Sequence, residues 1–92
     1  MTPEISRFRG IRVCIFWLET PEKTRHVAHL HIEYGEYRAQ VSLSDWEILD
    51  GQMPSKQLKV FQAWAEMHRK EIEMDVKLAM DGKPVFRIAP LV

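Results

Sequence analysis

The sequence lacks several features on which common enzyme classes depend. Its four glycines stand apart from one another, so there is no glycine-rich loop of the kind that cradles phosphate groups. There is also no Gly-x-Ser-x-Gly turn to present a serine nucleophile. No segment approaches the roughly 18 consecutive apolar residues that span a membrane, and the N-terminus shows no secretory pattern. We therefore expect a cytoplasmic protein without membrane attachment, outside the familiar nucleotide-binding and serine-hydrolase classes.

The sequence also has a single cysteine and a net charge of zero. Cys14 is the only cysteine, and it lies in the apolar run of residues 11–18, which indicates a small buried side chain in a reducing compartment. The 13 basic and 13 acidic side chains cancel, which argues against DNA binding through an overall positive field. The charge is uneven, however: residues 1–25 are mainly basic and residues 26–50 mainly acidic. This polarity favours a complementary protein partner.

The chain is long enough for a single domain, residues 1–92. The β-branched and aromatic residues 11–18 predict a strand. Strict alternation over residues 28–34 and 37–43, on either side of a glycine-containing turn, predicts a β-hairpin with one apolar face. A final short strand is expected around residues 85–88.

Residues 56–81 show apolar side chains at steps of three and four, which predicts a long amphipathic helix that ends at Gly82. The same pattern would fit two helices with a bend near His68. The predicted fold class is α+β: a small antiparallel, hairpin-based sheet packed against one long helix, straight or bent.

Three histidines form the pattern His26-x-x-His29-x-His31. In a strand, His29 and His31 project from the same face, about 6.5–7 Å apart. They could bind zinc or manganese, with His26 as a further ligand. They could instead be the catalytic acid and base of metal-independent RNA cleavage, with Arg25 or Arg38 on the phosphate. A solvated polar strand face explains the pattern equally well and needs no cofactor.

Three arginines, Arg7, Arg9 and Arg12, lie close together with Phe8 among them. Arginines beside an aromatic ring can bind RNA phosphates and stack a base, or they can bind an acidic protein surface. A solvated strand face with Phe8 packed inward is the plainer alternative. The segment is a candidate binding surface with two classes of partner.

Two residues of the predicted helix are further candidates. Trp64 belongs to the apolar stripe and so to the core, but it is offset from the stripe centre, and partial exposure would let it anchor a partner. His68 lies on the apolar side and is interpreted as an interior residue bonded to Glu71 or to a backbone carbonyl. A bend there would bring His68 toward the hairpin histidines.

Several short segments occur in a characteristic order: Pro3 to Phe8 with Gly10-Ile11, His29-Leu30-His31, Tyr34 to Tyr37, Gly51 with Pro54, Trp64-Ala65-Glu66 with His68, and Ile88 with Pro90-Leu91. Together they resemble the bacterial domain-of-unknown-function family numbered 4160, over nearly the whole chain. The resemblance implies no established activity. It implies a small bacterial protein, often encoded beside another small protein in an arrangement similar to toxin–antitoxin pairs.

Two hypotheses follow. In the first, the chain is the protein-binding component of a toxin–antitoxin-like or regulatory pair, and Arg7, Arg9 and Arg12 steer a small partner encoded nearby. Self-association of the chain stays open under this hypothesis. In the second, the chain is a small ribonuclease-like or metal-dependent enzyme that uses His29 and His31.

Overall fold

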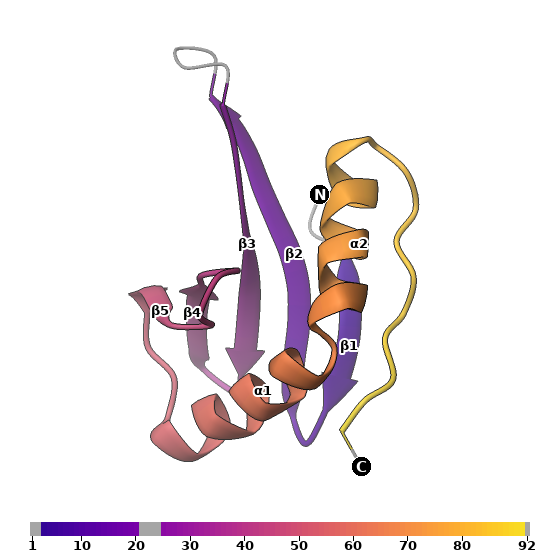
Figure 1. The fold of residues 1–92 in the computed structure, drawn as a ribbon. Helices are drawn as coiled ribbons and strands as arrows, with labels where there is room; N and C mark the ends of the chain where they lie inside the picture. Colours follow the sequence, from indigo (N-terminus) through magenta and orange to yellow (C-terminus); the bar gives the residue numbers. More distant parts are fainter. Residues whose placement is uncertain (1–2, 21–24, 92) are drawn as a thin grey trace.

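The computed structural model describes residues 3–20 and 25–91, with the side chains of residues 17–28 left outside the description. The chain forms five strands and then two helices: β1 (Glu4–Phe8), β2 (Ile11–Thr20), β3 (Arg25–Tyr34), β4 (Tyr37–Val41), β5 (Ile48–Gly51), α1 (Ser55–Met67) and α2 (Arg69–Met80). The strands pair antiparallel in the order β1-β2-β3-β4-β5. Both helices lie on the same face of this sheet (Figure 1). The α+β class and the antiparallel hairpin sheet are as predicted.

The alternation of side chains explains how the sheet meets the helices. Val13 pairs with Ile32 and Ile15 with Leu30, and all four side chains are fully buried in the core beneath the helices. The intervening pairs, such as Cys14 with His31, point to the opposite face, which no helix covers. Among the residues whose side chains the structure describes, Arg12, His29 and His31 therefore lie on the open face of the sheet.

The predicted single helix is in fact two, and the break falls at His68. Its backbone angles (φ −112°, ψ 24°) leave the helical region, and its N–H is shared between the carbonyl oxygens of Trp64 (3.1 Å) and Ala65 (3.2 Å). Figure 1 shows the change of direction, with α1 running across the strands and α2 running along β1 and β2. The expectation of one long helix is wrong, whereas the alternative of a bend near His68 is confirmed.

The C-terminal segment after α2, residues 83–91, contains no strand. We call it the tail. It runs back along α2 in an extended path (Figure 1). The strand expected around residues 85–88 is therefore absent, although the Ile88 N–H does donate to the Ile5 carbonyl of β1 over 2.8 Å. A single bond of this kind is not a ladder, which requires repeated pairing.

Candidate functional site

A shallow pocket of about 390 Å³ lies beside the turn between β1 and β2. Arg9 and Gly10 form this turn, and both have positive φ angles (49° and 80°), as in the two-residue turns that join twisted hairpins. Because the turn is tight, Arg7, Arg9 and Arg12 come to one place and line the pocket. The rest of the lining is supplied by Phe8, Gly10, Glu33 and Gly35.

Glu4 is the centre of the charged groups here. Its carboxylate accepts hydrogen bonds from Arg7 Nη2 (2.8 Å), Arg12 Nε (2.7 Å) and, from the tail, Arg87 Nη1 (2.6 Å). The Arg7 hydrogen bond, followed by those of Arg87 and Arg12, lowers the pKa of Glu4 from 4.5 to about 2. Glu4 is thus ionised at neutral pH and holds three guanidinium groups in fixed positions.

Glu33 on β3 continues the chain of ion pairs across the open face. Its carboxylate lies 3.3 Å from Arg12 Nη1 and 4.0 Å from Arg38 Nε of β4. The alternating charges therefore cross from the tail to β4. We call the arginines of this region the arginine surface: Arg7, Arg9, Arg12, Arg38 and Arg87.

Phe8 and Trp64 lie in the core and not on the arginine surface. Trp64 is fully buried and Phe8 is 5% exposed, and their ring centroids lie 5.0 Å apart. The indole N–H of Trp64 donates to the carbonyl of Ala89 in the tail over 2.8 Å. The core interpretation of Trp64 and the alternative of Phe8 packed inward are confirmed, and neither ring is exposed as an anchor for a partner would need to be.

His29 and His31 project from the open face, as predicted, but His29 is only 8% exposed. Its ring lies 5.1 Å from that of Phe16, and both ring nitrogens are buried without a hydrogen-bond partner. Burial, and to a smaller extent the charge of His31, lowers the pKa of His29. In this arrangement neither nitrogen of His29 can reach a bound substrate, which a general acid or base must do.

The other predicted metal or catalytic groups are dispersed. Among the residues that the structure describes, no group of three or more His, Cys, Asp or Glu side chains could hold a metal ion. Cys14 is 2% exposed and burial raises the pKa of its thiol, which agrees with the interpretation of a small buried residue. His68 bonds Glu71 through Nδ1 (2.6 Å), one of the two partners predicted for it, and its ring also packs against Trp64. The side chains of Arg25 and His26 lie outside the described residues, so their predicted roles stay predictions.

The sequence analysis missed Glu4 and Arg87 as members of the site. Glu4 stands three residues before Arg7, a spacing that could have suggested the pair. Arg87 is 83 positions away in the sequence, and no local pattern connects it with Glu4.

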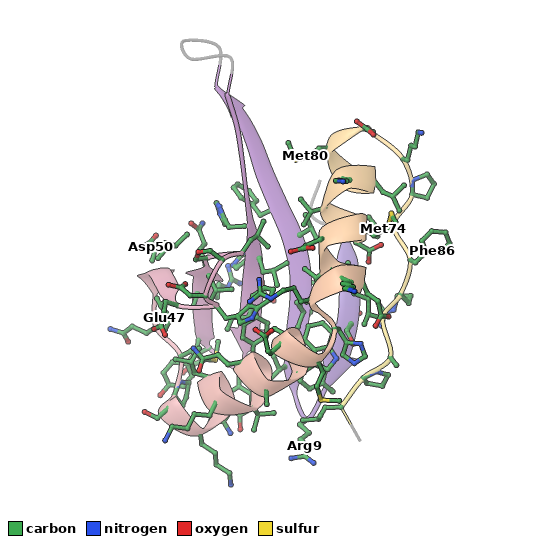
Figure 2. The ribbon with its side chains drawn as sticks, viewed as in Figure 1. Arg9, Glu47, Asp50, Met74, Met80 and Phe86 are labelled. Atoms are coloured by element: carbon green, nitrogen blue, oxygen red, sulfur yellow. The ribbon has the colours of Figure 1, made fainter. Side chains whose placement is uncertain are left out.

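Acidic side chains at the β5 side, including Glu47 and Asp50, lie apart from Arg9 (Figure 2). Glu33, which also belongs to the acidic half of the sequence, lies among the arginines, so the charge polarity of the sequence is only partly a polarity in space.

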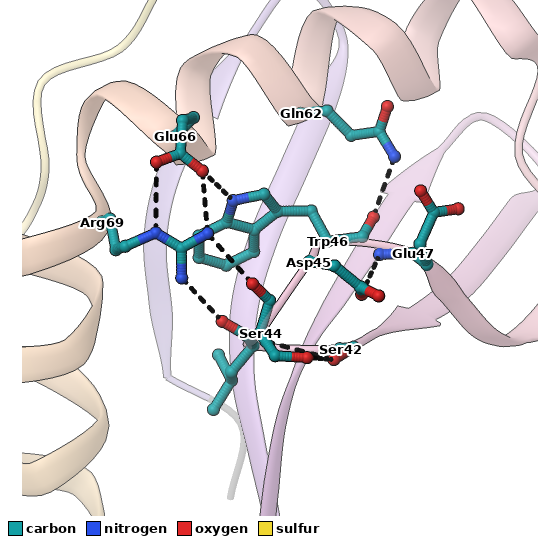
Figure 3. A network of polar contacts seen from close by, with 9 residues as sticks. Ser42, Ser44, Asp45, Trp46, Glu47, Gln62, Glu66 and Arg69 are labelled. Carbon is teal, nitrogen blue, oxygen red and sulfur yellow. Dashed lines mark hydrogen bonds and ion pairs between the residues drawn. The ribbon is translucent and has the colours of Figure 1, made fainter.

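A second polar network also had no signal in the sequence. Trp46, in the loop between β4 and β5, donates its indole N–H to Glu66 of α1 over 3.0 Å and accepts a hydrogen bond on its carbonyl from Gln62 (Figure 3). Arg69 of α2 stacks on the same indole. The network fixes the loop to the junction of the two helices, which is a structural role.

Comparison with known proteins identifies a family for this chain. No curated protein and no solved structure is detectably similar to the chain. In the described part of the chain, neither helix has the length and apolar character needed to cross a bilayer. The family described as "Domain of unknown function (DUF4160)" matches residues 10–75, most of the chain, and so includes β2 to β5, α1 and half of α2. The chain therefore belongs to the DUF4160 family.

Proposed function

We propose that this protein is the protein-binding component of a small two-protein unit, toxin–antitoxin-like or regulatory, and that it acts in the cytoplasm. Its partner presents carboxylate groups to the arginine surface. The observation that carries the proposal is a local surplus of positive charge. Four arginines of that surface share two carboxylates, Glu4 and Glu33: Arg7, Arg12, Arg38 and Arg87.

The arginine side chains are ordered before any partner arrives. Glu4 and Glu33 each hold their guanidinium groups from one side, whereas the Arg7 and Arg38 side chains remain 62% and 73% exposed. A guanidinium has five N–H donors, so a contact with Glu4 or Glu33 leaves other donors for a second carboxylate. Ordering in advance reduces the entropy lost on binding.

A protein partner fits this surface better than a nucleic acid. The positive surplus is confined to one region of a molecule with zero net charge, whereas a duplex attracts proteins through many phosphate contacts at once. The acidic β5 side of the molecule would repel a long polyanion but would not affect a small acidic protein docked at the arginine surface. RNA binding is thus an alternative outcome of the test.

The enzymatic hypothesis has less support. It needs His29 to exchange a proton with a substrate, yet both ring nitrogens are buried beneath the open face without partners. The buried ring therefore favours a binding role over catalysis by His29.

Co-expression with the product of the adjacent gene tests the proposal. We expect the two proteins to elute together in size-exclusion chromatography, and we expect the complex to weaken as the salt concentration rises. Charge reversal by Arg7→Glu with Arg9→Glu should weaken the complex by about tenfold or more, because like charges then face each other. The matched control is Lys56→Glu with Lys59→Glu, which makes the same change of charge at exposed positions of α1.

Separate elution at about 10 μM would overturn the pairing, because specific complexes commonly have micromolar or tighter dissociation constants. If the arginine and the lysine double variants weakened the complex equally, the partner would not bind at the arginine surface. Binding of a single-stranded RNA with loss on the same arginine reversal would overturn the choice of a protein partner.

A further inference from the structure

The tail occupies a groove between β1 and α2, and the contacts that hold it there are mostly made by its main chain. Figure 1 shows it passing along α2 toward the end of β1. Its hydrogen bonds are Phe86 N–H to Asp75 Oδ1 (2.9 Å), Ile88 N–H to Ile5 O (2.8 Å), Ser6 Oγ–H to Ile88 O (2.9 Å) and Trp64 Nε1–H to Ala89 O (2.8 Å). One tail side chain adds to these bonds: Arg87 Nη1 donates to the Glu4 carboxylate of β1 over 2.6 Å.

The groups that receive the tail are buried polar side chains. Ser6 and Asp75 are each 1% exposed, and Trp64 is fully buried. A buried polar group without a hydrogen-bond partner destabilises the fold by about 1–3 kcal/mol. These three side chains therefore need the polar main-chain groups of an extended segment beside them. The groove is therefore built to bind an extended chain.

Four tail side chains contact the fold: Ile88 is buried in the core, Val85 and Leu91 are partly buried against it, and Arg87 pairs with Glu4. Ile88 is 4% exposed and joins the core, whereas its neighbours Arg87 and Ala89 are exposed and Phe86 is 70% exposed. Main-chain hydrogen bonds with one apolar side-chain pocket are the pattern by which sheet edges bind extended peptides. β1 is an edge strand, because its other side pairs with β2, and it gives the tail one main-chain bond through Ile5. The side chains of Ser6, Trp64 and Asp75 supply the other bonds to the tail main chain.

The tail does not fill the groove or satisfy all of its polar groups. Asp75 Oδ2 is buried without a hydrogen-bond partner, so one acceptor is still free. A hollow of about 270 Å³ adjoins it, lined in part by Met74, Phe86 and Ile88. Met74 is 56% exposed, and it and Phe86 lie on the side of α2 along which the tail passes (Figure 2). A longer or more apolar segment would find further contacts there.

We propose that this groove is a peptide-binding site, in which an extended segment of a partner protein with a branched aliphatic side chain at the Ile88 position replaces the tail. The tail then acts as a built-in competitor. A tethered segment has an effective concentration in the millimolar range, so the partner's segment must outcompete it. This site goes beyond the arginine surface and shares with it only the Arg87–Glu4 ion pair.

A labelled synthetic peptide of residues 83–91 is the probe, because its sequence is known to fit. We expect it to bind the full chain with Ile88→Ala at least about tenfold more tightly than the wild-type chain, because the variant's own tail competes less. Phe86→Pro is the second variant: it removes the N–H that binds Asp75 and leaves the core side chains intact. A peptide with alanine at the Ile88 position should bind either variant at least about tenfold more weakly.

Hydrogen exchange of the wild-type chain tests the proposal without relying on the folding of a variant. Peptide at about 1 mM, near the tail's own effective concentration, should speed hydrogen exchange at the amides of Phe86 and Ile88. Unchanged exchange would overturn the proposal, as would equal binding of the native and alanine peptides. A wild-type dimer that excess peptide dissociates would assign the groove to the tail of a second copy and overturn the assignment to a partner.

The peptide test is separated from the arginine surface by a variant at an arginine that does not bind Glu4. Arg38→Glu should leave peptide binding unchanged, because Arg38 pairs with Glu33, whereas Arg87 of the tail pairs with Glu4. Failure of the peptide test with an intact partner complex would therefore reject the groove alone.

Discussion

The guanidinium of Arg69 lies over the indole of Trp46, with Cζ 4.6 Å from the ring centroid (Figure 3). Its N–H groups also donate to the carbonyl oxygens of Leu43 and Ser44, both over 3.1 Å, and to Glu66. Trp46 has a positive φ of 61°, which is unfavourable for a bulky residue. The planar guanidinium thus holds a strained loop against the junction of the two helices.

Arg69→Lys tests this relationship without changing the charge. A lysine ammonium lacks the planar fork, so it cannot stack on the indole and bind Glu66 and two carbonyls at once. We expect a lower midpoint of thermal unfolding and a weaker near-ultraviolet circular dichroism band from Trp46. Lys70→Arg, the reverse exchange at the next and exposed position, should change neither. An unchanged midpoint in Arg69→Lys would show that charge alone holds the loop.

Glu4→Gln should remove a pH-dependent part of the stability. The pKa of Glu4 is lowered from 4.5 to about 2, chiefly by its hydrogen bond with Arg7. A lowered pKa in the folded state stabilises the protein above pH 4.5, and this contribution is lost as the pH falls toward 2. The variant should therefore be less stable than the wild type at pH 7, and the difference should shrink between pH 4.5 and pH 2.

Urea unfolding at a series of pH values measures that difference. Glu36→Gln, at an exposed turn position, is the matched control and should run parallel to the wild type. A difference between Glu4→Gln and the wild type that stays constant down to pH 2 would contradict the role of the Glu4 charge. High salt should reduce the effect, since the arginines around Glu4 are partly exposed.

The sheet was predictable because its signal is local. Alternation over residues 28–34 and 37–43 places Leu30, Ile32 and Val41 on one face, and all three are fully buried. A break near His68 was an open alternative that the pattern could not decide, because the apolar steps run through Ala65, His68 and Ile72 without a change of phase and no proline or glycine marks it. Periodicity predicts which face of a helix is buried. The direction of each helix axis depends on how the helix packs against the sheet.

The site was predictable only where its residues are neighbours in the sequence. Arg7, Arg9 and Arg12 could be grouped from their spacing, but Arg87 reaches Glu4 through the path of the tail, which no pattern predicts. The burial of Trp64 follows from its place in the apolar stripe, but the contact of its indole with the tail could not be predicted. A single stripe implies one buried face, whereas the tail covers a second side of α1 and accepts the indole N–H.

Gly51→Ala should destabilise the fold more than an alanine at another left-handed glycine. Gly51 has φ 90°, and a Cβ there would lie 2.2 Å from the carbonyl oxygen of Arg38 on the paired strand. Gly82 has φ 73° with open space around it, so Gly82→Ala should cost only the left-handed penalty of about 1–2 kcal/mol. Gly51→Ala should cost about 1–3 kcal/mol more from overpacking. Equal losses in urea unfolding would contradict the close approach of β5 to β4.

His29→Leu should make the protein less sensitive to acid. Burial is the larger cause of the lowered pKa of His29, whose ordinary value is 6.5. The native state therefore binds fewer protons than the unfolded state, and the wild type loses stability as the pH falls below 6.5. Between pH 6.5 and pH 5 this loss is at most about 2 kcal/mol, since one pKa unit corresponds to about 1.4 kcal/mol. The change to leucine removes no hydrogen bond, because both ring nitrogens of His29 lack partners.

Urea unfolding at pH 7, 6 and 5 separates this effect from general acid sensitivity. His29→Leu should show a flatter dependence of unfolding free energy on pH than the wild type. His31→Gln, two residues along the same strand face, should keep most of the wild-type slope, because the charge of His31 is the smaller cause of the shift. The same slope in His29→Leu and the wild type would mean that the imidazole is not held neutral in the folded state. A proton-transfer role for His29 would then regain support, since such a ring must exchange protons with water or substrate.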